Sequence, residues 1–152
     1  MSLESVRAFF AEKAPDIAIV ETEESSATVA LAAEAHRVEP DQIAKTICLG
    51  VGDRVLLVVA SGLSRLDNKK VRQAFGGKGK MLPPERVVEI TSHPVGGVCP
   101  FGLPAPLPIY CDVSLQRFDT VVPAAGATNS AVHIATDRLA ALTGAEWVDV
   151  CQ

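Results

Sequence analysis

The residues best suited to chemistry lie in three segments that are far apart in the chain. Lys45 opens the apolar run KTICLGV, a glycine- and proline-rich stretch, GGVCPFGLPAPLP, spans residues 96–108, and the small-residue segment AAGATNSAVHI spans residues 124–134. A lysine ammonium can bind an anion or a charged transition state, and bare main-chain groups can hold a substrate. Serine, asparagine or histidine can bind a substrate or transfer protons.

The glycine-rich stretch offers a thiol and a bare main chain. Cys99 could act as a nucleophile only as a thiolate with a base in hydrogen-bond reach. The turn-rich sequence HPVGG gives no reason to bring His93 to that thiol, so we favour Cys99 as a small side chain that fills the loop. Gly96 and Gly97 let main-chain groups approach a ligand closely, and Pro100 stiffens the segment. A structural turn is the alternative interpretation of the whole loop.

Lys45 alternates with the apolar residues Ile43, Ile47 and Leu49, which is the period of a strand. A lysine on that face would be unfavourable to bury unless a polar or anionic group met its ammonium. The alternative is an exposed lysine at the end of a strand.

The third segment combines a turn with a strand. Asn129 and Ser130 are typical of turns that bond their own backbone. His133 follows on an apolar strand, where a histidine is more often a core or edge residue than a catalyst.

Basic residues are concentrated in one part of an acidic protein. The 152-residue chain has a net charge of −4, yet residues 65–86 contain seven basic and two acidic residues and carry about +5. Such a run is either a solvated face or a surface that contacts phosphates. The candidates for RNA contact are Lys69, Lys70, Arg72, Lys78 and Lys80.

The elements that must position these residues follow no strict strand–helix alternation. We expect helices at residues 3–14, 26–38, 66–77, 83–92 and 136–144, the last capped by Thr136 and closed by Gly144. We expect strands at residues 45–51, 54–61, 107–115, 119–126, 130–136 and 146–151, the first two forming a hairpin through Gly52-Asp53. The expected fold is α/β (α+β): a single domain over residues 1–152, with a strongly curved mixed β-sheet or partial barrel and helices packed outside.

Composition argues against several classes of protein. No apolar run approaches the ~20 residues that cross a bilayer, and the N-terminus lacks a secretion signal, so we expect a cytoplasmic protein without a membrane partner. The four cysteines form no CxxC pair and the three histidines are dispersed, which predicts reduced thiols, no metal and no cofactor. No leftover apolar stripe indicates a partner subunit, which favours a monomer.

Taken together, IAKTICL, the stretch from SRLDNKK to PFGLP, and AAGATNSAVHIATDRLAALTGAEWVDV resemble the YbaK/ProX family of aminoacyl-tRNA editing deacylases. That family is similar to the editing insertion of bacterial prolyl-tRNA synthetases. The resemblance covers the chain from about residue 20 to its end. It implies that Lys45 matches the family's central lysine and that residues 96–100 match its GxxxP loop.

The third segment departs from the family pattern. Some members carry functional Ser and Asp residues there, where this chain has Ala131 and Arg138, with Ser130 and Asp137 one place away. The departure suggests a subfamily with its own amino-acid preference.

The resemblance implies hydrolysis of the ester that joins a wrong, small amino acid to the 3′ acceptor end of a tRNA. It also implies an aminoacyl-tRNA synthetase as a further partner, and no DNA. Because that ester is already activated, a positioned water and main-chain dipoles suffice, and pocket size sets specificity. The expected catalytic groups are Lys45, Gly96 and Gly97, and the expected substrate-binding residues are Thr46, Val98, Cys99, Pro100, Asn129, Ser130 and His133. The alternatives are a non-catalytic tRNA-end or synthetase-associated binding module, a thiol hydrolase that uses Cys99, and a catalytically silent interaction protein.

Overall fold

A long antiparallel hairpin forms the centre of the protein, whose computed structural model describes residues 2–152. Strands β2 (Ile43–Val51) and β3 (Arg54–Ser61) pair along their whole length, from Ala44 opposite Ser61 to Val51 opposite Arg54. The turn between them uses Gly52 with φ of 61°, a conformation that glycine adopts without strain. The predicted hairpin is confirmed.

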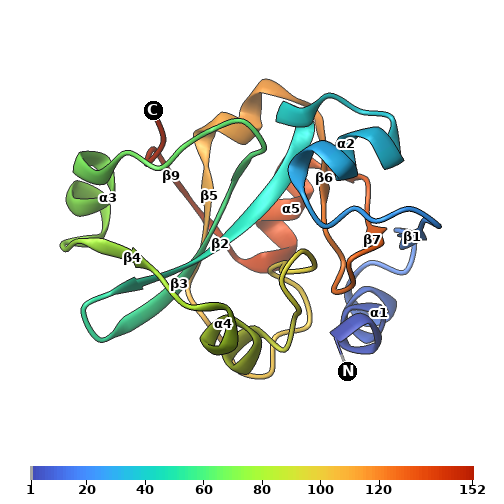
Figure 1. Ribbon diagram of the computed structural model, residues 1–152, viewed down its shortest axis with the longest axis horizontal. Coiled ribbons are helices and arrows are strands. Elements are labelled where there is room, and N and C mark those ends of the chain that lie inside the picture. Colours follow the sequence, from blue (N-terminus) through green and yellow to red (C-terminus); the bar gives the residue numbers. More distant parts are fainter. Residues whose placement is uncertain (1) are drawn as a thin grey trace.

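The other strands extend this hairpin into a mixed sheet with the order β8-β6-β2-β3-β5-β9. Pairing is parallel from β3 to β5 and from β5 to β9, parallel from β2 to β6, and antiparallel from β6 to β8. The sheet curves strongly into half a barrel (Figure 1), as predicted. The strand bounds are β5 Ile109–Asp112, β6 Thr120–Pro123, β8 Ile134–Ala135 and β9 Glu146–Val148.

Helices cover both faces of the sheet (Figure 1). On one face, α1 and α5 bury Phe10 and Leu139 against a core that includes Val59 and Phe101. On the other face, α3 buries Val71 and Phe75 against the hairpin. The helix bounds are α1 Ser2–Lys13, α2 Val29–His36, α3 Asn68–Phe75, α4 Pro84–Thr91 and α5 Thr136–Thr143, with 3₁₀ turns at Pro40–Gln42 and Val113–Arg117. None of these helices has the length and apolarity that a bilayer span requires.

Two of the differences from the sequence expectations concern the strand after the third segment's turn and the start of α5. The predicted strand at residues 130–136 is two short strands: β7 (Ser130–Ala131) pairs with β1 (Val20–Glu21), while β8 pairs with β6. Thr136 does not cap α5, because it is the first helical residue and its hydroxyl donates to the Phe118 carbonyl. The closing Gly144, with φ of 68°, is confirmed.

The sheet is interrupted on one side of β2. There β6 pairs with residues 43–44, and a short strand that the sequence did not predict, β4 (Gly79–Met81), pairs with residues 49–51. Residues 45–48 have no strand partner on that side. Every second residue of this stretch therefore presents its main-chain N–H and C=O to whatever lies in the gap.

Candidate active site

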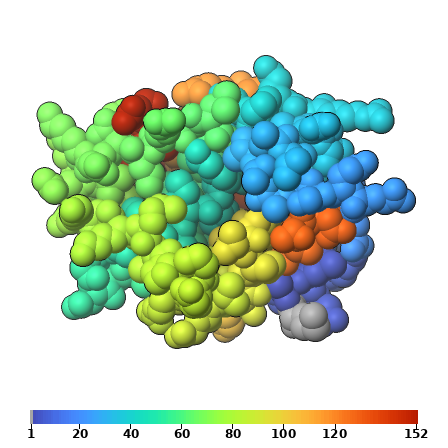
Figure 2. All heavy atoms as spheres, viewed as in Figure 1, coloured from blue at the N-terminus to red at the C-terminus, as the bar shows by residue number. Residues whose placement is uncertain are grey.

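A pocket of about 330 Å³ lies at this gap. Its walls come from β2, the segment that leads into α2, α4 with the following loop, and the region of β6 and β7. Figure 2 shows the surface hollowed here, with the teal atoms of β2 lying deeper than the blue atoms of α2 and the segment before it and the yellow atoms of the segment that follows α4. The pocket thus lies where residues distant in sequence meet.

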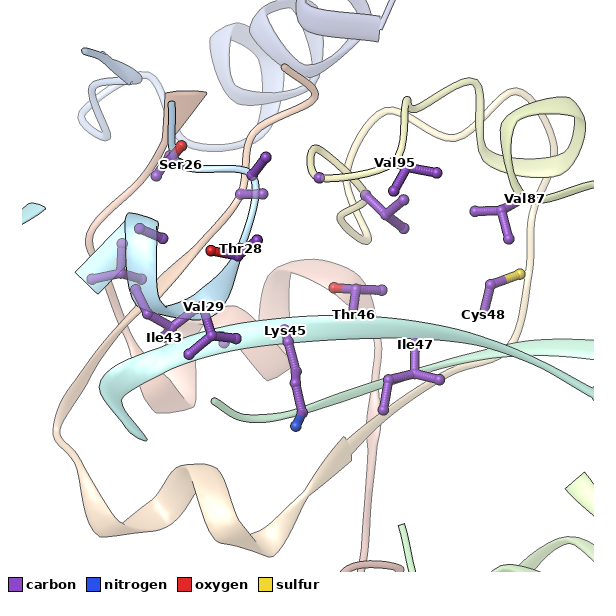
Figure 3. A pocket seen from close by; sticks show the side chains of 18 of the residues that line it. Ser26, Thr28, Val29, Ile43, Lys45, Thr46, Ile47, Cys48, Val87 and Val95 are labelled. Atoms are coloured by element: carbon purple, nitrogen blue, oxygen red, sulfur yellow. The ribbon is translucent and has the colours of Figure 1, made fainter. Parts of the chain in front are cut away.

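The side chains of β2 divide between the two faces of the strand. Thr46 and Cys48 point toward the loop of Val95 and toward Val87 on α4, whereas Lys45 and Ile47 point to the opposite side (Figure 3). The pocket is therefore bounded at β2 by two small side chains and by main chain.

The Lys45 ammonium is held on the far face of β2. Its Nζ donates to the carbonyl of Gly62 at 3.1 Å and to the carbonyl of Ser64. Burial lowers the pKa of Lys45 from its usual value. These two carbonyls are polar partners of the kind that a half-buried lysine on an apolar strand face requires.

The glycine loop is packed too tightly to carry side chains. Gly96 has φ of 90°, and a Cβ there would lie 2.7 Å from the Ala27 Cβ. A Cβ on Gly97 would lie 2.9 Å from the Ala127 main-chain nitrogen. The Gly97 carbonyl accepts a hydrogen bond from the Gly126 N–H at 3.1 Å, which ties the loop to the third segment. Within the loop, Gly96 and Val98 line the pocket.

Cys99 and Pro100 lie behind the loop, in the core. The structure corrects one expectation, since His93 Nε2 lies 3.4 Å from the Cys99 Sγ. Both side chains are 0% exposed. Burial raises the pKa of the Cys99 thiol to about 12, so this pair has neither a thiolate nor access to a substrate.

The third segment contributes Ser130 and Ala131 to the pocket wall. The Ser130 hydroxyl accepts a hydrogen bond from the Ala127 N–H at 3.0 Å. Arg138 lies elsewhere and forms two 2.6 Å hydrogen bonds with Asp16.

Besides Cys99 and Pro100, two more of the predicted substrate-binding residues, Asn129 and His133, do not line this pocket. The Asn129 side chain donates to the Thr22 carbonyl at 2.9 Å and so joins the turn to the segment after β1. His133 is exposed, and its ring centroid lies 5.6 Å from that of His36. The division of the predicted strand into β7 and β8 places His133 outside the pocket.

Several pocket residues were missed by the sequence analysis. Cys48 is buried, with 4% of its surface exposed, and it also lines the pocket; its period-two spacing from Thr46 could have indicated that the two residues share a face. Burial raises the pKa of the Cys48 thiol, which disfavours the thiolate. The Thr46 hydroxyl is buried and has no partner among residues 2–152. Other lining residues that the sequence did not indicate include Ser26, Ala27, Thr28 and Val29 at the start of α2, and Met81, Leu82, Pro84, Val87 and Val95 around α4.

The predicted RNA-contacting residues lie on α3 and β4 and on the segment between them. Lys69, Arg72, Lys78 and Lys80 are exposed. Lys70 instead donates to Asp149 Oδ1 at 3.0 Å and to the Cys151 carbonyl at 2.9 Å. Lys80 lies in β4 next to the pocket residue Met81, but it does not itself line the pocket. Among residues 2–152, no three His, Cys, Asp or Glu side chains gather as metal ligands would.

Known proteins share this fold and sequence. The model of the aminoacyl-tRNA editing domain matches residues 23–142. The uncharacterized protein YwhH of Bacillus subtilis (strain 168) is 47% identical over 154 residues, covering 100% of this chain and 98% of that protein. A crystal structure of a protein whose proposed role is that of a trans-editing enzyme for prolyl-tRNA synthetase has a TM-score of 0.92 at 32% identity, covering 99% of this chain and 97% of the other. The hypothetical protein APE2540 has a TM-score of 0.90 at 27% identity, covering 97% of this chain and 99% of the other. By its fold, its glycine loop and the extent of these matches, the chain belongs to the aminoacyl-tRNA editing domain family.

Proposed function

We propose that this protein is a hydrolase that removes a small, wrongly attached amino acid from the 3′ end of a tRNA. The observation that carries this proposal is the pocket itself. It is bounded by a side-chain-poor glycine loop on one side and by the unpaired main chain of β2 on the other.

The pocket walls suit a small aminoacyl group. Thr46 and Cys48 form the β2 wall, and Val87, Val95 and Val98 form the opposite one. Apolar walls discriminate by volume, at about 1–3 kcal/mol per methylene, so they admit small side chains and reject larger ones. The proposed substrate is therefore an ester of a small amino acid, selected by size.

The chemistry assigned to the pocket is water attack assisted by main-chain dipoles. The main chain of Gly96 reaches the pocket without an intervening side chain, and preorganised N–H donors contribute about 3–4 kcal/mol each to stabilising an oxyanion. None of the three histidines lines the pocket, and the Cys48 thiol is protonated at neutral pH. A covalent intermediate on the protein is accordingly not part of the proposal.

Lys45 is the proposed charged participant. Its side chain borders the pocket, but its ammonium is bound to the carbonyls of Gly62 and Ser64 on the far face of β2. For the ammonium to bind ribose or phosphate oxygens, it must exchange these carbonyls for oxygens of the substrate.

The test is release of amino acid from a panel of mischarged tRNAs by the parent and by Lys45→Met. We expect the parent to release small amino acids, and Lys45→Met to lose at least about 100-fold in kcat, the scale of removing one stabilising group from a transition state. Lys70→Met is the matched control, because Lys70 also donates to a main-chain carbonyl, that of Cys151, yet lies outside the pocket.

The outcomes separate the competing functions. Tight tRNA binding without release of any amino acid would replace the hydrolase with a tRNA-end binding module. Parental turnover in Lys45→Met would remove the lysine from the mechanism while leaving the hydrolase in place.

A further inference from the structure

His93 is a fully buried imidazole to which the proposed reaction assigns no part. It follows α4 directly, and both of its ring nitrogens have partners. Nδ1 contacts the Ser2 hydroxyl oxygen at 2.5 Å, and Nε2 lies 2.8 Å from the Phe101 carbonyl oxygen. The ring therefore joins the start of α1 to the chain just beyond the glycine loop.

Ser2 extends this connection to the third segment. Its hydroxyl also donates to the Gly126 carbonyl at 2.5 Å. Gly126 in turn donates its N–H to the Gly97 carbonyl. The two contacts bracket the glycine loop: His93 holds the chain after it, at Phe101, and Ser2 holds the turn to which Gly97 is bonded.

A count of protons shows how closely the two side chains depend on each other. The carbonyls of Phe101 and Gly126 only accept, and the Ser2 hydroxyl has one proton. A neutral imidazole adds one more, so two protons serve three contacts. An imidazolium supplies the third proton, because Nδ1–H then donates to Ser2 while Ser2 donates to Gly126. The Ser2 oxygen is thus the partner that a protonated Nδ1 needs.

The surroundings of the ring oppose that protonation. Burial lowers the pKa of His93, while the hydrogen bond to Phe101 raises it. The Cys99 thiol lies 3.4 Å from the ring, and it is neutral because burial raises its pKa to about 12. Ser2 and the Phe101 carbonyl are thus the two groups that favour the charged ring.

We propose that Ser2 and His93 form a clamp that positions the Gly96–Pro100 loop, and through it the main-chain groups that face the pocket. Neither side chain lines the pocket, so both are positioning residues rather than catalytic ones. The effect on turnover rests on the proposed function, whereas the clamp itself is measurable without it.

The direct test is the pKa of His93, followed by NMR in the parent, Ser2→Ala and Ser2→Thr, each expressed without an N-terminal tag. Ser2→Ala removes the acceptor for Nδ1–H, so the pKa of His93 should fall by about half a unit or more. Ser2→Thr keeps the hydroxyl and should restore it. His36 supplies a control signal in the same spectra, and its pKa should not change.

Amide exchange and turnover test the positioning. In Ser2→Ala the protection of the Gly126 N–H against hydrogen exchange should fall about tenfold, because the hydrogen bond that joins the Gly126 turn to the start of α1 is lost. On mischarged tRNA, kcat should fall about tenfold with KM within twofold, because substrate binding groups are untouched, and Ser2→Thr should recover it.

The results distinguish the clamp from the proposed function. An unchanged His93 pKa and unchanged Gly126 protection in Ser2→Ala would overturn the clamp, whatever the activity. If both change but kcat does not, the clamp exists and does not position the reacting groups, which overturns the positioning role. If the parent releases no amino acid, the hydrolase fails, and the NMR and exchange results still decide the clamp.

Discussion

Burial decides which side chains of this protein can react. Cys99 and His93 lie 3.4 Å apart, a distance at which a thiol and an imidazole can act together in catalysis. Both are nevertheless 0% exposed, and the pKa of the thiol is raised to about 12. Their contact thus belongs to the support of the glycine loop.

Replacing Cys99 with alanine should leave deacylation within about twofold of the parent. The free energy of unfolding should fall by about 1 kcal/mol, since the change removes one buried sulfur atom from the core. Steady-state kinetics with mischarged tRNA and urea unfolding give both quantities. A 100-fold loss of kcat in a protein that unfolds normally would return the thiol to the mechanism.

Within the described residues 2–152, the hydroxyl of the pocket residue Thr46 is buried without a hydrogen-bond partner. Thr46→Val has nearly the same shape and removes that hydroxyl, so the free energy of unfolding should rise by about 1 kcal/mol or more. Thr143→Val is the control, because its hydroxyl donates to the Leu139 carbonyl at 2.9 Å and its loss should destabilise the protein. Urea unfolding of both variants supplies the measurement, and a destabilised Thr46→Val would mean that the hydroxyl has a partner in solution.

At the scale of elements, two structural features shape the pocket. One is the interruption of the sheet beside β2, and the other is the Gly96–Pro100 loop on the opposite side. The interruption arises because β6 and β4 pair with opposite ends of β2. The loop packs closely against the rest of the protein because its glycines contact the Gly126 turn and the segment before α2. Neither feature involves a reactive side chain.

Gly97→Ala tests whether the loop must pack closely against the Gly126 turn. Its Cβ would lie 2.9 Å from the Ala127 nitrogen, so the main chain must shift and the pocket-facing groups move with it. We expect kcat to fall at least about tenfold and stability to fall by about 1–3 kcal/mol.

Gly77→Ala is the matched control, since a Cβ there meets only a γ-methyl of Val51, at 3.1 Å, and no main chain. Its kcat should stay near the parental value. Equal losses in the two variants would show that the effect is one of general destabilisation rather than of loop position.

At the scale of the whole molecule, charge is distributed unevenly between the two ends. The exposed residues Lys69, Arg72, Lys78 and Lys80 belong to α3 and β4 and the segment between them, at the end of the molecule away from α1 (Figure 1). A tRNA whose 3′ end enters the pocket would meet this end with its phosphates.

Lys80→Gln should weaken tRNA binding and reduce the slope of log K against log salt by about 0.7–0.9, the value for one lost phosphate contact. Lys13→Gln, an equally exposed lysine at the end of α1, should leave the slope unchanged. Titrations at several salt concentrations provide the slopes. Identical slopes for both variants and the parent would assign the basic segment to a solvated face.

Much of the architecture could be predicted because it follows from short-range patterns. The hairpin of β2 and β3 follows from two apolar runs around Gly52-Asp53, and α5 ends where Gly144 permits a left-handed turn. The strands of two and three residues, β1 and β4, escaped prediction because such short segments have no measurable periodicity. Their existence depends on the partners that they meet.

The candidate site was predicted in its parts but not in its arrangement. Residue types and their order indicated Lys45, the Gly96–Gly97 loop and Ser130, along with the family that combines them. Three features could be seen only in the folded protein: the direction of the Lys45 ammonium, the contact of His93 with Cys99, and the position of His133 outside the pocket. Which face of β2 carries Lys45, and whether residues 130–136 form one strand or two, decide where these side chains point. Neither property can be predicted from the few residues that surround them in the sequence.

The sequence by itself determined the local conformations and the supply of chemical groups, because dihedral preferences and apolar periodicity act between near neighbours. The tertiary structure decided which groups share the pocket and which support it from behind. This arrangement depends on contacts between residues up to 124 positions apart, such as Ser2 and Gly126. Such contacts stabilise the protein only once the whole core has folded.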